Sequence, residues 1–74
     1  MFEDKNLAAS VDNKLRSCYQ LLEESIWEVN KQCNEEQAKA YRQKIGGIFS
    51  ILVFELMGPL YEAHPELKPP DWED

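Results

Sequence analysis

Apolar residues recur every three or four positions in two separate stretches of the chain, and each stretch predicts an amphipathic α-helix. Placed about 100° apart per residue, the apolar positions of the first stretch fall within an arc of roughly 100°. They predict a helix over about residues 4–32, with Asp4, Asn6 or Ser10 as its N-cap. This first stripe consists of Leu7, Val11, Leu15, Cys18, Leu22, Ile26, Val29 and Cys33.

The second stretch predicts a helix over about residues 35–57. Asn34 is a suitable N-cap, and Gln37 follows three residues later, as in a capping box. Gly58-Pro59 predicts the end of this helix, because proline has no N–H with which to continue the ladder of helical hydrogen bonds. The second stripe consists of Ala38, Tyr41, Ile45, Ile48, Phe49, Leu52 and Leu56.

The phase between the two stripes decides between one long helix and two shorter ones. In one unbroken helix the second stripe would lie about 160° around from the first, on the opposite side of the rod. A turn near residues 32–34 lets the two stripes face each other instead. We therefore predict an all-α fold with an antiparallel two-helix hairpin in residues 1–57. Residues 58–74, which contain all four prolines, are predicted to form a short helical turn and an extended acidic tail.

The second predicted helix carries more apolar surface than a single neighbouring helix can cover. Ile51, Phe54 and Met57 lie about 100–180° from its main stripe, and a helix that is apolar all round is buried all round. We predict that two hairpins pair as a homodimer into a four-helix bundle. The predicted interface consists of Ile48, Ile51, Phe54 and Met57. The alternative is that residues 59–74 fold back and cover Phe54 alone.

Two adjacent glycines, Gly46 and Gly47, interrupt the second helix. Each weakens a helix by roughly 1 kcal/mol relative to alanine, so a compensating contact is expected. One interpretation is a close approach of helices, for example where two chains cross. The other is a hinge or a notch beside a ligand.

The charge of the chain is unevenly distributed. The formal net charge is −6, and residues 45–74 carry Lys68 as their only basic residue against six acidic ones. A protein that binds nucleic acid needs clustered Lys and Arg to neutralise phosphates. We therefore expect no nucleic-acid partner.

The most apolar stretch, residues 45–61, is short for a membrane span. It contains 17 residues with Glu55 as its one charge, whereas a spanning helix needs about 20 mostly apolar residues. Its glycines and Pro59 weaken the case further. The N-terminus also lacks the basic region and apolar stretch of a signal peptide. We expect no membrane insertion and a cytoplasmic location.

The two cysteines and the single histidine offer little chemistry. Cys18 and Cys33 stand 15 residues apart on one predicted helix, roughly 22 Å, whereas a disulfide needs Cα atoms within about 7 Å. We expect two reduced, partly buried thiols. His64 stands between Glu62 and Glu66 in the tail, and one histidine falls short of the three or four ligands of a zinc site. We expect a solvated histidine, no metal site, no cofactor and no catalytic residue.

Two tryptophans are candidate anchors for a partner protein. Trp27 falls about 160° from the centre of the first stripe, among polar residues. Its alternative role is a cation–π contact with Lys31 or cover from a neighbouring chain. Trp72 follows Pro69-Pro70 in the acidic tail, which resembles an extended recognition peptide. Equally, Trp72 could attach the tail to the helices.

These features favour a small cytosolic helical protein that acts as an oligomeric interaction module, an adaptor or a regulator, and that is not an enzyme. Its expected partners are a second copy of the chain and another protein. The alternative function is to bind a small apolar ligand held between the bundle helices. A dry interior pocket bordered by Gly46 and Gly47 would favour the ligand, and a fully packed core would favour the adaptor.

Overall fold

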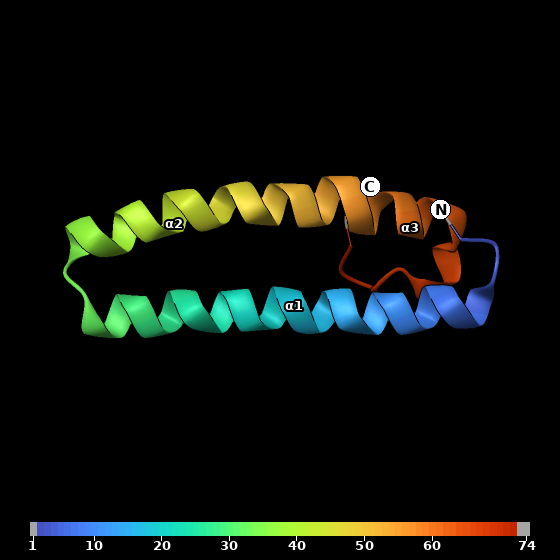
Figure 1. Cartoon of the computed structure of the whole chain (residues 1–74), viewed down its shortest axis with the longest axis horizontal. Helices are drawn as coiled ribbons and strands as arrows, with labels where there is room; N and C mark the ends of the chain where they lie inside the picture. The colour runs from blue at the N-terminus through green and yellow to red at the C-terminus, as the bar shows by residue number, and fades with distance from the viewer. Residues whose placement is uncertain (1, 73–74) are drawn as a thin grey trace.

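Two long antiparallel helices joined by a short turn make up most of the molecule, as Figure 1 shows. The computed structural model describes residues 2–72, and these contain no strand. The predicted all-α hairpin is therefore confirmed. The ends of the predicted acidic tail, Glu73 and Asp74, lie outside the described residues. The elements are α1 (Lys5–Gln32), α2 (Glu35–Ser50), the π-helical segment η1 (Ile51–Met57), α3 (Gly58–Ala63) and the 3₁₀ turn η2 (Pro65–Leu67).

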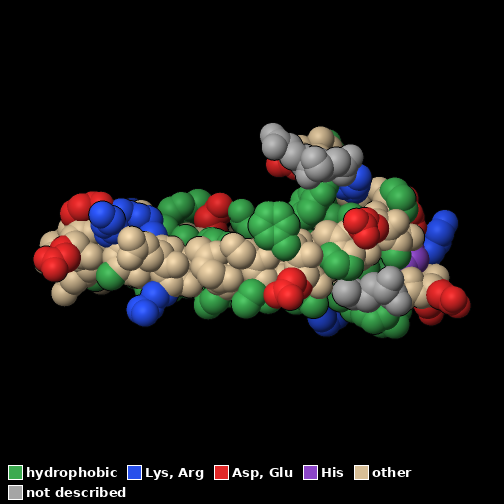
Figure 2. Space-filling view, turned by 90° about the horizontal axis from the view of Figure 1, so that it is seen from above, with side chains coloured by type: hydrophobic (Ala, Val, Ile, Leu, Met, Phe, Trp, Pro, Cys, Tyr) green, Lys and Arg blue, Asp and Glu red, His purple; other side chains and the backbone are tan. Residues whose placement is uncertain are grey.

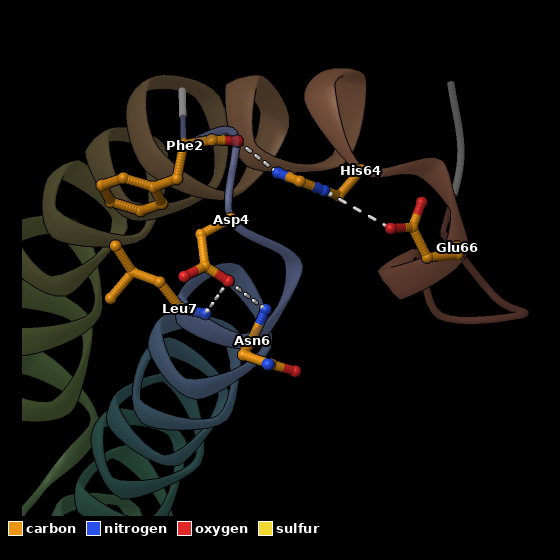
Figure 3. Close-up of polar contacts among 6 residues, drawn as sticks. All are labelled: Phe2, Asp4, Asn6, Leu7, His64 and Glu66. Atoms are coloured by element: carbon orange, nitrogen blue, oxygen red, sulfur yellow. Dashed lines mark hydrogen bonds and ion pairs between the residues drawn. The ribbon is translucent and has the colours of Figure 1, made fainter.

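Each long helix begins at a side chain that caps its first free N–H groups. Asp4 Oδ1 accepts from the backbone N–H groups of Asn6 at 2.8 Å and Leu7 at 3.3 Å, as drawn in Figure 3. Asp4 is thus the N-cap among the three candidates. The Asn34 side chain accepts from the Gln37 N–H at 2.8 Å. The cap of the second helix could be predicted from the sequence, whereas that of the first had three candidates, of which the structure selects Asp4.

The helix does not end at Gly58-Pro59, and that prediction is wrong. The Gly58 N–H bonds to the carbonyl of Val53, five residues earlier, which is the π-helical spacing. In an α-helix the proline ring would clash with the carbonyl four residues before it. The wider π turn before Pro59 changes that spacing, so the ribbon continues to Ala63. A Cβ at Gly58 would come within 3.2 Å of the Val53 carbonyl oxygen, which explains a glycine at this turn.

The main core lies at the end of the hairpin where the two termini meet. Leu60 and Tyr61 from α3 are 0% and 1% exposed, and they pack with Ala8, Leu52 and Met57. Met57 is therefore buried inside its own chain, which corrects its assignment to an interface with a second copy. The cause is the continuation into α3, which turns Met57 towards α1 and the returning tail.

The buried seam of α1 is displaced from the predicted stripe. Leu7 is 48% exposed, whereas its neighbour Ala8 is fully buried. Asp12 is also buried, at 4% exposure. The residues of this seam follow one another at alternating spacings of four and three, so they form one continuous side of the helix: positions 8, 12, 15, 19 and 22. Asp12 in this seam was missed from the sequence because its partner Tyr61 comes from α3, 49 residues further along the chain.

The half of the hairpin near the turn is held by a thinner layer of contacts. Tyr19 and Phe49 stack with ring centroids 4.7 Å apart, across α1 and α2. The Ser25 and Tyr41 hydroxyls are hydrogen-bonded at 2.8 Å. Arg42 donates to Asn30 and to Glu35, both at 2.7 Å, and so ties the helices together beside the turn. These contacts leave the outer side of α2 uncovered.

Candidate interaction surface

The outer side of α2 and η1 carries exposed apolar side chains along the middle of the rod. Ile48 is 48% exposed, Ile51 56% and Phe54 75%. Figure 2 looks down on this side, where green side chains lie along both margins of a tan band in the middle of the rod, with red of Asp or Glu among them. The sequence has no Lys or Arg between Lys44 and Lys68. Three of the four predicted interface residues are therefore exposed, Ile48 on α2 and Ile51 and Phe54 on η1, whereas Met57 is buried.

Gly46 and Gly47 do not serve a close approach inside the chain. Both are exposed, and a Cβ built on either would meet no heavy atom within 4 Å. Neither glycine borders an interior pocket between the two helices. Their open space belongs to the same outer side that carries Ile51 and Phe54.

The tail folds back onto the hairpin without covering Phe54. Trp72 packs edge-on against Tyr61, with ring centroids 4.9 Å apart. Tyr61 in turn comes from α3, and its hydroxyl donates a hydrogen bond to Asp12 on α1. Trp72 is half-buried and holds the described end of the tail against the core. The exposure of the Phe54 ring therefore contradicts the alternative in which the tail covers it.

Asp12 connects the tail to α1 through Arg16. The Arg16 guanidinium lies 3.0 Å from the Asp12 carboxylate and donates to the Leu67 carbonyl at 2.7 Å. Burial, and after it the hydrogen bond to Asp12, raise the pKa of the Tyr61 hydroxyl above its ordinary value. The i, i+4 pair of Asp12 and Arg16 was visible in the sequence, but nothing local pointed to Tyr61.

His64 is buried rather than solvated, so that prediction is wrong. It is 5% exposed at the end of α3, and its Nε2 donates to the Phe2 carbonyl, as Figure 3 shows. Its Nδ1 lies 3.4 Å from a carboxylate oxygen of Glu66. A backbone hydrogen bond at Glu66, and after it the interaction with His64, lower the pKa of that carboxyl. The extension into α3 places His64 against the N-terminal residues, 62 positions away.

A shallow groove of about 700 Å³ runs between α1, η1 and the tail. Its walls are largely apolar, and the Arg16 guanidinium lies at its edge. The groove is large enough for a small apolar molecule by volume. The principal lining residues are Arg16, Tyr19, Phe54, Met57, Pro69 and Trp72.

The remaining candidate residues are exposed. Trp27 on α1 is 55% exposed, which leaves its ring available to a partner. Leu21 on the same helix is 66% exposed and was not singled out from the sequence. Cys18 and Cys33 are free and exposed, which corrects the expectation that they are partly buried.

The described residues offer no constellation for metal chemistry. Within residues 2–72 no group of three or more His, Cys, Asp and Glu side chains is placed to hold a metal ion. In the same range every buried side-chain nitrogen and oxygen has a hydrogen-bond partner.

One helix passes a test for membrane spans based on length and composition. The continuous helical stretch Glu35–Ala63 has 29 residues and contains an 18-residue window of mean hydropathy 1.4. Only 28% of that window is buried inside the chain. A helix that packs against another protein passes the same test, so the apolar outer side of α2 needs cover of some kind.

No family model, curated protein or solved structure matches this chain. Its function is therefore argued from the surface itself.

Proposed function

We propose that the protein is a homodimeric helical interaction module, in which two hairpins pair through the outer side of α2 and η1 into a four-helix assembly. The observation that carries this proposal is the exposed row of Ile48, Ile51 and Phe54, with Phe54 at 75% exposure. Each such side chain gains about 1.5–3 kcal/mol when it is fully buried. In a twofold-symmetric contact, each of these side chains would be buried twice, once from each copy.

The accessible surface of the chain supports pairing. A compact monomer of 8.6 kDa exposes about 4,700 Å² by the usual scaling with mass. This chain exposes 5545 Å², an excess of roughly 850 Å². One partner in a standard interface loses about 800 Å². The excess thus matches what a stable dimer needs from each copy.

The elongated shape supports the same conclusion. The radius of gyration is 14.5 Å, against about 11 Å for a compact domain of this length. Two helices in contact along one side form a rod, and a rod of 45 × 19 × 18 Å has long open faces. If a second hairpin packed along one such face, the resulting dimer would be about as thick as an ordinary small domain.

In this proposal the dimer acts as an adaptor or regulator in the cytoplasm and performs no catalysis. Trp27 and Leu21 on α1 lie away from the row on α2 and supply large exposed side chains for another protein. The proposed dimer would present each of them twice. Such a bivalent display strengthens binding to a partner that also has two sites.

A second candidate function is the binding of a small apolar ligand, and the groove beside Trp72 is the observation that favours it. The site differs from the predicted one, because it lies beneath the tail and not beside Gly46 and Gly47. An uncharged apolar ligand suits the groove, because the Arg16 guanidinium at its edge is already paired with Asp12 and Asp71 also lines it. Titration with an uncharged naphthylamine dye should quench or shift Trp72 fluorescence in a Trp27→Phe background if this candidate is correct.

The proposed dimer is tested by sedimentation equilibrium of the unmodified chain. Loaded at micromolar concentration, it should give about twice the 8.6 kDa mass of one chain. A mass of one chain at every concentration up to the millimolar range would exclude the proposal.

A further inference from the structure

We propose that the two copies pair antiparallel through Gly47, Ser50, Ile51 and Phe54, so that Phe54 of each copy packs over Gly47 of the other. This inference rests on the proposed function, since it describes the contact that would form the dimer. All four residues are exposed. Three lie on α2 or at its end, and Phe54 is one turn into η1.

The spacing of these residues suits an antiparallel partner. Gly47, Ser50 and Ile51 lie on one side of α2 by their α-helical spacing. Phe54 follows in the π-helical η1 and lies at the margin of that side towards the tail. The set is symmetric about the point between Ser50 and Ile51. An antiparallel copy centred there brings residue 54 opposite residue 47, and residue 50 opposite residue 51.

The side-chain sizes complement one another in that arrangement. The large Phe54 meets Gly47, and Ile51 meets the small Ser50. The space above Gly47 is open, since a Cβ there would touch no heavy atom within 4 Å. Its φ angle is not positive, so the backbone does not require glycine. A partner's ring in this space gives Gly47 the compensating contact that a helical glycine calls for.

A parallel pairing in register lacks this complementarity. It would set Phe54 against Phe54 and Gly47 against Gly47, which crowds one end of the contact and leaves a hole at the other. Close packing disfavours both faults. Shape therefore selects the antiparallel arrangement.

Charge also selects it. Glu55 and Lys44 are exposed on the same margin of the helix, 11 residues apart. In the antiparallel pairing Glu55 lies opposite residue 46 of the other copy, two residues, or about 3 Å along the axis, from its Lys44. Two symmetric pairs of opposite charge would then flank the apolar contact and fix its register. In a parallel pairing in register, the margin that carries Glu55 and Lys44 lies on opposite flanks of the contact in the two copies, so these pairs of opposite charge do not form.

The arrangement places the two α2 helices at the centre and the two α1 helices outermost. The outer side of α2 lies opposite the buried side that carries Ala38, Ile45 and Leu52. Each α2 helix would then be covered on both sides, as its apolar composition requires.

Disulfide trapping distinguishes the pairings. Ser50→Cys and, as the matched control on the same exposed side, Gln43→Cys are made in a chain with Cys18→Ser and Cys33→Ser. In the antiparallel dimer the two Ser50→Cys positions are about one residue apart along the axis, within the 7 Å or so that a disulfide spans. The two Gln43→Cys positions are 15 residues apart, or about 22 Å.

Under mild oxidation in a glutathione buffer, Ser50→Cys should form a cross-linked dimer on a reducing-agent-free gel, and Gln43→Cys should stay monomeric on the same gel. Cross-linking of both variants would indicate a parallel pairing and overturn the inference. If sedimentation of both variants shows a dimer but neither cross-links, the copies do not pair in this register and the inference is wrong. Sedimentation of Phe54→Glu then decides whether the outer side of α2 and η1 still forms the proposed dimer. If the unmodified chain sediments as a monomer, both the proposed function and this inference are wrong.

A size swap tests the contact between Phe54 and Gly47. Gly47→Phe alone should weaken dimerisation at least tenfold, because two large rings then compete for one space. The double variant Gly47→Phe with Phe54→Gly restores one large and one small partner, and it should recover most of the loss. Dimers of equal strength in all three proteins would contradict the proposed contact.

Discussion

The hydroxyl of Tyr61 donates a hydrogen bond to the buried carboxylate of Asp12, 49 residues earlier in the chain. The ion pair of Asp12 with Arg16, and the bond from Arg16 to the Leu67 carbonyl, extend this contact to the tail. One buried acid thus joins α1, α3 and the returning tail. It holds the main core of the chain closed at the end where the termini meet.

Replacement of Asp12 should destabilise the fold strongly. Asp12→Ala leaves the buried Tyr61 hydroxyl without its acceptor, and a hydrogen bond to a charged group is worth about 1.5–3 kcal/mol. We expect a loss of that size in the free energy of unfolding, measured by urea denaturation. Asn13→Ala, at the exposed neighbouring position, should change it by no more than about 0.5 kcal/mol. An equal loss in the free energy of unfolding for Asp12→Ala and Asn13→Ala would show that the buried carboxylate does not stabilise the fold.

Alkaline pH should destabilise the protein through Tyr61. Its pKa in the folded chain is raised above the ordinary value of 10.0, so the folded state prefers the neutral hydroxyl. The contribution is complete below about pH 10 and is lost as pH rises through the raised folded pKa. Melting temperatures followed from about pH 8 upwards should therefore fall at the alkaline end, and Tyr61→Phe should reduce the slope of that fall. An unchanged slope in Tyr61→Phe would assign the alkaline loss to other groups.

Removal of the Trp72 ring should loosen the tail. An edge-on aromatic pair adds about 0.5–1.5 kcal/mol beyond the area that it buries. In a Trp27→Phe background, we expect Trp72 fluorescence to be blue-shifted and partly protected from acrylamide. Trp72→Ala should then lower the melting temperature by several degrees, since about 1 kcal/mol shifts a domain of this size by about 4–8 °C. A fully quenched Trp72 whose removal leaves the melt unchanged would mean that the tail is not attached.

Alanine substitutions should separate two kinds of glycine in the long helix. Gly46→Ala meets open space and should raise helix stability by up to about 1 kcal/mol. Gly58→Ala brings a methyl group to 3.2 Å from the Val53 carbonyl oxygen, so it should give no such gain and could lower stability. Chemical denaturation of the two variants tests this difference. An equal gain at both positions would show that the π turn accommodates a side chain.

The elements that could be predicted from sequence depend on neighbours a few residues away. The two stripes, the Asn34 cap and the turn near residue 33 all follow from local periodicity and capping. Asp12 on α1 could not be recognised as buried, because its partner Tyr61 reaches it only after the chain reverses. His64 was misjudged for the same reason, since its partner Phe2 stands 62 residues away.

The continuation of the helix past Pro59 was missed for a different reason. A proline normally ends an α-helix, and only the change to π-helical spacing in η1 makes the continuation possible. That change then rotates Met57 into the core and leaves Ile51 and Phe54 outside. Of the four residues predicted for the interface, Ile48, Ile51 and Phe54 are exposed, and Met57 belongs to the chain's own core.

The central claim is that the chain dimerises through the outer side of α2 and η1. The most direct measurement is sedimentation equilibrium of Phe54→Glu beside Leu21→Glu, at equal concentrations and with helicity checked by circular dichroism. Both side chains are largely exposed in the single chain, at 75% and 66%, so neither change should unfold the hairpin. Phe54→Glu should sediment as a monomer, because a dimer would bury the new charge, while Leu21→Glu on α1 should remain a dimer. A folded Phe54→Glu protein that stays dimeric would contradict the account.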